Sequence, residues 1–104
     1  MNLKGSLPLL ILNVLEAGPS HGYQIAQQIK RQSQGELDFK EGTLYPALHN
    51  LEKLGQLESY EAKENGRPRR YYHLTVSGQA ALEKERAAWQ RYVKAVDLNL
   101  RGSK

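Results

Sequence analysis

The sequence predicts a mainly α-helical fold with one small β-hairpin. Four segments have apolar positions typical of helices, and in the last of them large apolar side chains recur every seven residues. Between the third and the last of these segments, residues 57–63 and 70–75 alternate loosely between apolar and polar, which is typical of strands. Asn65-Gly66 lies between them, and Asn-Gly is the strongest short-range signal for a tight hairpin turn.

The first helix is expected from about Ser6 to Ala17. Pro8 falls in its first turn, where the missing amide proton does no harm, and Gly18-Pro19 ends it. Its apolar residues surround nearly the whole circumference, as in a helix that is buried on every side. Because a domain of this size can hardly cover both faces from within, a second copy of the chain is the simplest cover.

The second helix is expected from His21 to Ser33, with Ser20 as its N-cap. Its buried side would consist of the apolar and aromatic residues Tyr23, Ile25, Ala26 and Ile29. A short strand is expected over residues 37–39.

A third helix is expected from Glu41 to Leu54, ending at Gly55. The hairpin follows, and a long last helix should begin at Thr75 or Ser77 and run to about Leu98. The order helix, helix, short strand, helix, hairpin, helix is that of a winged helix-turn-helix with a helical appendage.

Composition restricts the class of protein. The chain has 104 residues, which suits one core of modest size, and a net charge of +4 with a pI near 9.4 favours a nucleic-acid partner. It has no cysteine, so disulfides and thiolate metal sites are excluded. Without a signal-peptide pattern or an apolar run long enough to cross a bilayer, we expect a cytoplasmic protein with no membrane partner.

The third helix offers a polar outer face. On a helical wheel Leu44, Ala47, Leu48 and Leu51 gather on one side. The opposite side carries Gly42, Pro46, His49 and Lys53, flanked by Tyr45 and Asn50. Such donors, acceptors and one cation suit the reading of base edges in a major groove, although an ordinary solvated helix face has the same pattern.

The hairpin carries positive charge for which a turn has no structural need. Arg67, Arg69 and Arg70 would lie at its tip with Lys63 at its base, within reach of phosphates or of the minor groove. Pairing of these cations with Glu61 and Glu64 in a solubilising loop is the alternative. Exposed ion pairs contribute only about 0–1 kcal/mol, which hardly accounts for three arginines in four positions.

These motifs resemble those of the PadR family of transcriptional regulators. The resemblance rests on His21-Gly22-Tyr23, on residues 41–52 (EGTLYPALHNLE) and on residues 66–75 (GRPRRYYHLT) followed by Gly78, and it covers nearly the whole chain. It implies a homodimeric repressor of the short subgroup, with a single C-terminal helix, that binds a pseudo-palindromic operator in double-stranded DNA. It implies DNA contacts from Thr43, Tyr45, Pro46 and His49 and from the wing arginines.

Together, the helix face, the hairpin and the resemblance predict one DNA-binding set. Its members are Tyr23, Thr43, Tyr45, Pro46, His49, Asn50, Lys53, Lys63, Arg67, Arg69 and Arg70. We expect a winged-helix DNA-binding domain over residues 1–75 and a C-terminal dimerisation helix with its tail over residues 76–104.

The last helix is amphipathic and has no core left to fill in its own chain. We therefore expect it to pack against the first helix of a partner subunit. The predicted dimer interface comprises Leu10, Val14, Leu82, Trp89, Val93, Val96 and Leu100.

Trp89 also has a second interpretation, which comes from the resemblance. Multidrug-sensing members of the PadR family use a tryptophan at this place as a platform for flat aromatic effectors between subunits. The corresponding pocket here would be lined by Leu9, Asn13, Glu16, Ala88, Trp89, Tyr92, Val93 and Val96. Glu16 or Asp97 would suit a cationic effector. An interface anchor alone is the simpler role for Trp89.

The sequence contains no sign of catalysis. Its three histidines lack carboxylate neighbours at metal-ligand spacing, its serines lack the context of a catalytic triad, and no phosphate-binding glycine loop is present. We therefore expect neither an enzyme nor a metal or cofactor site. A ligand-responsive repressor is the leading interpretation; the alternatives are a winged-helix module for protein interaction and a ligand-binding dimer without operator recognition.

Overall fold

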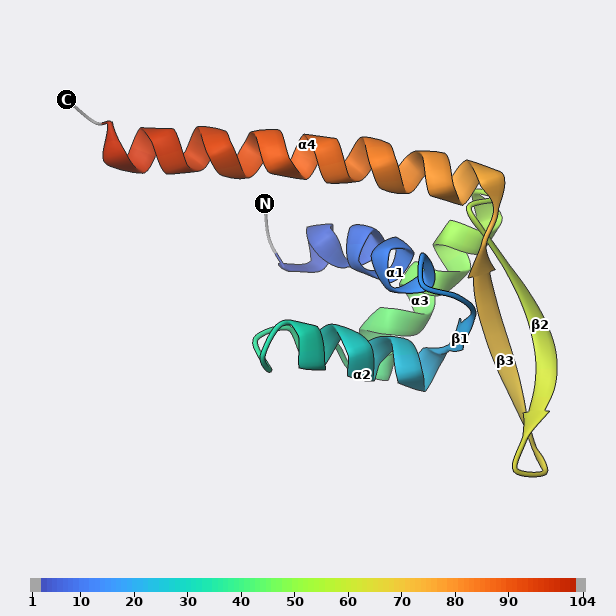
Figure 1. Ribbon diagram of the computed structural model, residues 1–104. Coiled ribbons are helices and arrows are strands. Elements are labelled where there is room, and N and C mark those ends of the chain that lie inside the picture. Colours follow the sequence, from blue (N-terminus) through green and yellow to red (C-terminus); the bar gives the residue numbers. More distant parts are fainter. Residues whose placement is uncertain (1–2, 103–104) are drawn as a thin grey trace.

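The computed structural model describes residues 3–102 and consists mainly of helices (Figure 1). A 3₁₀ turn over Leu3–Ser6 leads into the first of the helices, which are α1 (Leu7–Leu15), α2 (Gly22–Gln32), α3 (Glu41–Lys53) and α4 (Val76–Arg101). Helix α1 lies between α2 and α4 and contacts both. This arrangement explains why α1 is apolar on nearly every side.

A three-stranded antiparallel sheet flanks the helices, with β1 (Ser20–His21) next to β3 (Arg67–Leu74) and β3 next to β2 (Leu57–Glu64). Strands β2 and β3 form the expected hairpin, which is the wing. At its turn Asn65 and Gly66 have φ values of 54° and 79°, the left-handed pair that a type I′ turn requires. In Figure 1 the wing extends away from α4 and ends in this turn.

One hydrophobic core holds these elements together. Its fully buried members come from all four helices and from the wing, and they are Leu7, Ile11, Leu12, Leu15, Ile25, Ile29, Leu44, Leu48, Leu51, Leu57, Tyr72 and Leu82. The predicted inner face of α3 is confirmed, since Leu44, Leu48 and Leu51 are all buried. The mainly helical fold with its wing and long last helix is therefore the one that the sequence predicts.

Helix α4 is anchored to the rest of the chain through its first half. Its N-cap is Thr75, whose hydroxyl accepts from the Gly78 amide at 3.0 Å and donates to the Gly55 carbonyl at 2.6 Å. Gly78 and Leu82 are buried, but every side chain from Gln90 to Gly102 is exposed. The far end of α4 accordingly projects beyond the rest of the chain in Figure 1.

The predicted beginning of α2 and the predicted short strand were wrong. His21, not Ser20, is the N-cap of α2, because Ser20 pairs with Tyr72 as part of β1. Residues 37–39 form no strand; Leu37 and Phe39 pack against the core from a loop instead. The third strand of the sheet is β1, which consists of two residues and has no periodicity to detect.

Two side chains lie on unexpected sides. Tyr23 is 60% exposed, so it does not belong to the buried side of α2. Leu82 is completely buried in its own chain, because the first turns of α4 pack on the core, and it therefore has no surface to offer a partner subunit. The division at residue 75 stays a prediction, and residues 1, 2, 103 and 104 of the two predicted ranges lie outside the described residues.

Candidate nucleic-acid interface

Helix α3 presents its polar face to solvent. Pro46, His49, Asn50 and Lys53 are exposed, while Thr43 is half-buried. They lie opposite the buried leucines that fix the helix in the core. The outer face therefore carries hydrogen-bonding groups on a rigid element, which is the arrangement that base reading requires.

Tyr45 lies at the edge of this face, against the beginning of α2. A Cβ atom placed on Gly22 would stand 2.5 Å from the Tyr45 Oη and 2.8 Å from its Cζ. Only glycine leaves room for the ring at this position. The glycine of the His-Gly-Tyr motif therefore allows α2 to pack closely on α3. Tyr45 contributes to this packing in addition to its predicted contact with DNA.

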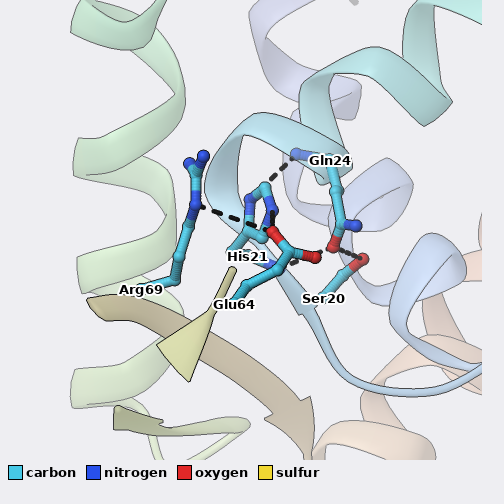
Figure 2. Close-up of polar contacts among 5 residues, drawn as sticks. All are labelled: Ser20, His21, Gln24, Glu64 and Arg69. Atoms are coloured by element: carbon cyan, nitrogen blue, oxygen red, sulfur yellow. Dashed lines mark hydrogen bonds and ion pairs between the residues drawn. The ribbon is translucent and has the colours of Figure 1, made fainter. Parts of the chain in front are cut away.

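His21 caps α2 and also contacts the wing (Figure 2). Its Nδ1 accepts from the Gln24 amide at 3.4 Å, and the Gln24 side-chain oxygen accepts from the His21 amide at 3.4 Å and from the Ser20 hydroxyl at 3.3 Å. On the other side of the ring, Nε2 lies 3.5 Å from a carboxylate oxygen of Glu64. With Nδ1 accepting, the neutral ring carries its proton on Nε2 and donates toward the wing.

Glu64 also contacts Arg69. The same carboxylate oxygen lies 3.7 Å from the Arg69 Nε, and both side chains are about one-third to two-fifths exposed, at 35% for Arg69 and 40% for Glu64. In Figure 2 the two terminal nitrogens of Arg69 point away from Glu64. Arg69 thus contacts Glu64 through the Nε edge of its guanidinium group.

Arg70 is held by a different set of groups, at the base of the wing. Its Nη1 donates to the Ser59 hydroxyl at 2.7 Å, and that hydroxyl donates to a carboxylate oxygen of Glu52 at 2.6 Å. Because Glu52 belongs to α3, this chain of hydrogen bonds joins the wing to the helix. The expected positions of the wing cations were wrong in two respects. Of the three arginines only Arg67 adjoins the turn, since the others follow one another down β3, and Lys63 lies beside the turn rather than at the base.

A groove of about 370 Å³ separates the beginning of α2, α3 and the wing. Its lining brings together five residues of the predicted DNA-binding set, which are Tyr23, Tyr45, His49, Arg69 and Arg70. The other lining residues are His21, Gly22, Pro68 and Tyr72. Burial raises the pKa of Tyr72, so its phenol is neutral at physiological pH.

The remaining predicted residues flank this groove. Thr43, Pro46, Asn50 and Lys53 belong to α3, and Lys63 and Arg67 stand near the turn of the wing. Lys63 and Arg67 are exposed, and among residues 3–102 neither has an ion-pair partner.

The predicted effector and dimer residues lie on α1, at its C-cap and on α4, and none of them lines this groove. Trp89, Tyr92, Val93 and Val96 are 37–43% exposed, and Leu100 is 72% exposed. Leu9, Leu10, Val14 and Ala88 are half-buried. The α4 side chains form an exposed apolar stripe, whereas Leu10 and Val14 of α1 line a pocket with Ile29 and Gln32 of α2.

The polar members of the predicted effector pocket already have partners in the same chain. Arg86 donates to Asn13 Oδ1 at 2.8 Å and to Glu16 at 3.0 Å, and Gln79 donates to the other Glu16 oxygen at 3.0 Å. The hydrogen bonds from Gln79 and Arg86 lower the pKa of Glu16. Asp97 pairs with Arg101. Both carboxylates, Glu16 and Asp97, are therefore already paired with arginines of the same chain.

His21, Glu64, Ser59 and Glu52 position the interface, and the sequence-based prediction did not include them. The His-Gly-Tyr motif was the available signal for His21, because a histidine before a helix can act as its N-cap. Nothing in the sequence pairs Glu64 with His21, because the contact depends on β1 joining the sheet. Pairing of Glu64 with a wing arginine, considered above as the alternative, does occur at Arg69.

Residues 3–102 contain no group of three or more histidine, aspartate or glutamate side chains that could hold a metal ion. None of the helices over the same range has the length and apolar character to cross a membrane.

Known proteins resemble this chain in sequence and in fold. A transcriptional regulator of Mycobacterium tuberculosis is 34% identical over 93 residues, which cover 89% of this chain and 84% of the relative. A crystal structure from Streptococcus mutans has a TM-score of 0.87 at 37% identity, covering 99% of this chain and 92% of that one. A PadR family transcription regulator from Clostridium difficile has a TM-score of 0.77 at 36% identity, covering 92% and 97%.

Residues 11–84 match the family model described as "Transcriptional regulator PadR-like family". That match spans well over half of the chain, and the family consists of DNA-binding transcriptional regulators rather than enzymes. The chain therefore belongs to the PadR-like family of transcriptional regulators.

Proposed function

We propose that the protein is a homodimeric repressor that binds a pseudo-palindromic operator. The observation that carries this proposal is the groove in which His49 and Tyr45 of α3 face Arg69 and Arg70 of the wing. A polar helix face and a basic hairpin on one side of the molecule match one duplex, with α3 in the major groove and the wing along the backbone.

Within this interface the residues divide by what they can touch. Thr43, Tyr45, Pro46, His49 and Asn50 are the candidates for base edges. Lys53, Lys63 and the wing arginines are the candidates for phosphates, and Tyr23, exposed at the start of α2, is a further candidate for the backbone. The regulator then acts where the DNA is, in the cytoplasm.

The exposed stripe of α4 supports the dimer. Trp89, Val93 and Val96 leave large apolar surfaces uncovered along a helix whose second half is exposed to solvent. A two-fold pairing that buries this stripe together with Leu10 and Val14 would place two α3 helices about 34 Å apart, one helical turn of DNA.

The proposed function includes a small aromatic effector. A small aromatic molecule that stacks on Trp89 between subunits would change the angle between the two α4 helices. The α3 helices would then no longer meet both half-sites at once, and affinity for the operator would fall.

The test is an anisotropy titration of the protein with DNA from upstream of its own gene, competed by a scrambled duplex. We expect competitor-resistant binding by two subunits per site. His49→Ala should weaken binding to the operator more than binding to the scrambled duplex. Arg67→Ala should weaken both equally and reduce the salt slope by about 0.9, the value for one phosphate.

Arg101→Ala is the matched control, because it removes one exposed cation at the far end of α4. It should leave the titrations unchanged. Binding of the upstream DNA no better than of the scrambled duplex would refute recognition of that site. Binding that is unaffected by both His49→Ala and Arg67→Ala would refute the proposed interface and favour a protein-interaction module.

A further inference from the structure

The four cations of the wing differ in what surrounds them. Lys63 and Arg67 stand near the turn with no ion-pair partner among residues 3–102. Arg70 donates to Ser59, and Arg69 has its Nε 3.7 Å from the Glu64 carboxylate. A phosphate that approaches Arg69 therefore meets a guanidinium whose charge is already partly balanced.

The carboxylate of Glu64 is held in place by more than Arg69. Its Oε1 lies 3.5 Å from the Nε2 of His21, a buried ring whose other nitrogen accepts from the α2 backbone. His21 is only 5% exposed, so this contact anchors Glu64 to the helix-turn-helix. In Figure 2 dashed lines mark the contacts of the Glu64 carboxylate with both His21 and Arg69.

We propose that Glu64 limits the affinity of the wing for DNA by withholding Arg69 from the phosphate backbone. This inference rests on the proposed function. A carboxylate 3.7 Å from Arg69 Nε competes with a DNA phosphate for the same guanidinium group. When Arg69 contacts DNA, a phosphate must replace the Glu64 carboxylate as its anionic partner. The gain in binding free energy is therefore smaller than for Arg67, which gives up no ion pair among residues 3–102.

The competing interpretation is that Glu64 orients Arg69 for its contact with DNA. The terminal nitrogens of Arg69 do point away from Glu64, which would suit that role. However, a pair at 3.7 Å between side chains that are 35% and 40% exposed restrains the orientation of a guanidinium only weakly, whereas the carboxylate balances part of the Arg69 charge in any orientation. The two interpretations predict opposite signs when the charge is removed.

Glu64→Gln tests the proposal, because it removes the charge and keeps an acceptor for His21 and Arg69. Affinity for a random duplex should rise by about fivefold, the upper range for an exposed ion pair, and the salt slope should steepen by up to about 0.9. Glu61→Gln is the matched control, since Glu61 is an exposed wing glutamate opposite Arg70 that makes no ion pair with any residue from 3 to 102. It changes the net charge equally and should have a much smaller effect.

The dependence on Arg69 completes the test. In an Arg69→Ala background, Glu64→Gln should have no more effect than Glu61→Gln. Glu64→Asp keeps the net charge and withdraws the carboxylate by one methylene, so it should also tighten binding, and it replaces Glu64→Gln should that variant not fold.

Each other outcome overturns the proposal. Equal effects of Glu64→Gln and Glu61→Gln would mean that only the net charge of the protein matters. Weaker DNA binding by Glu64→Gln would assign Glu64 the role of orienting Arg69. An effect that persists in Arg69→Ala would exclude the withholding of Arg69. If the unaltered protein binds no duplex at all, the proposed function fails as well, and the two failures are thereby distinguished.

Discussion

The packing of Tyr45 on Gly22 makes a prediction whose sign depends on a second residue. In Gly22→Ala the new Cβ would lie 2.5 Å from the Tyr45 Oη and 2.9 Å from its Cε1, well inside van der Waals contact. The ring must move, and overpacking of this kind costs about 1–3 kcal/mol. For a domain of this size that lowers the melting temperature by about 4–8 °C for each kcal/mol.

With Tyr45 replaced by alanine, the same substitution should become neutral or stabilising. Gly22 begins α2 with an ordinary helical backbone, and alanine is favoured over glycine in helices by up to about 1 kcal/mol. The coupling between the two sites should therefore be about 2 kcal/mol. Urea unfolding followed by helical circular dichroism measures it, at one fixed protein concentration because association also stabilises.

Gly42→Ala is the control for this cycle. Gly42 lies in the first turn of α3, and a Cβ there would meet nothing within 4 Å. It should stabilise the protein slightly whether or not Tyr45 is present. Equal costs of Gly22→Ala in both backgrounds would show that the ring is not what excludes a side chain at this position, and the account of the His-Gly-Tyr motif would fail.

Three further predictions concern α4 and its contacts. Thr75→Ala should lower the free energy of unfolding by about 1 kcal/mol through loss of the N-cap, measured by urea unfolding; a change within error would contradict the anchoring of α4 at its beginning. Hydrogen bonds from Gln79 and Arg86 lower the Glu16 pKa below 4.5, so this carboxylate stabilises the fold above that pH, and the effect disappears as the pH falls through the lowered value. Glu16→Gln should therefore destabilise the protein at neutral pH but not at a pH below the lowered pKa, and a loss that is independent of pH would refute the contribution of charge. Trp89→Ala should shift sedimentation toward monomer, whereas unchanged association would exclude Trp89 from the proposed interface.

The parts of the fold that the sequence predicted are those with a strong local pattern. Asn65-Gly66 specifies a type I′ turn by its own backbone preferences, and the leucines of α3 mark its inner face at helical spacing. Strand β1 could not be predicted, because two residues carry no periodicity and their pairing with Tyr71 and Tyr72 depends on distant parts of the chain. The N-cap was misplaced by one residue for the same reason.

The candidate site shows the same division between local and distant causes. Which residues are polar and point outward on α3 follows from the helical wheel, so Pro46, His49 and Asn50 are exposed as the wheel requires. How the arginines are engaged does not follow, since Arg69 meets Glu64 across the turn and Arg70 reaches Ser59 on the opposite strand. Leu82 shows the limit of a seven-residue repeat, which gives the apolar stripe but not the point at which the stripe leaves the core.

The short strand β1 has a mechanical consequence for DNA recognition. Because Ser20 and His21 pair with the wing and His21 also caps α2, the wing, α2 and, through Glu52 and Arg70, α3 are joined as one rigid body. In the proposed complex, contacts of this kind favour a fixed spacing of the wing and α3, so that the duplex bends or twists to fit them. In the proposed dimer, base steps between the half-sites that deform easily will be favoured although no side chain touches them, and the spacer will be part of the operator.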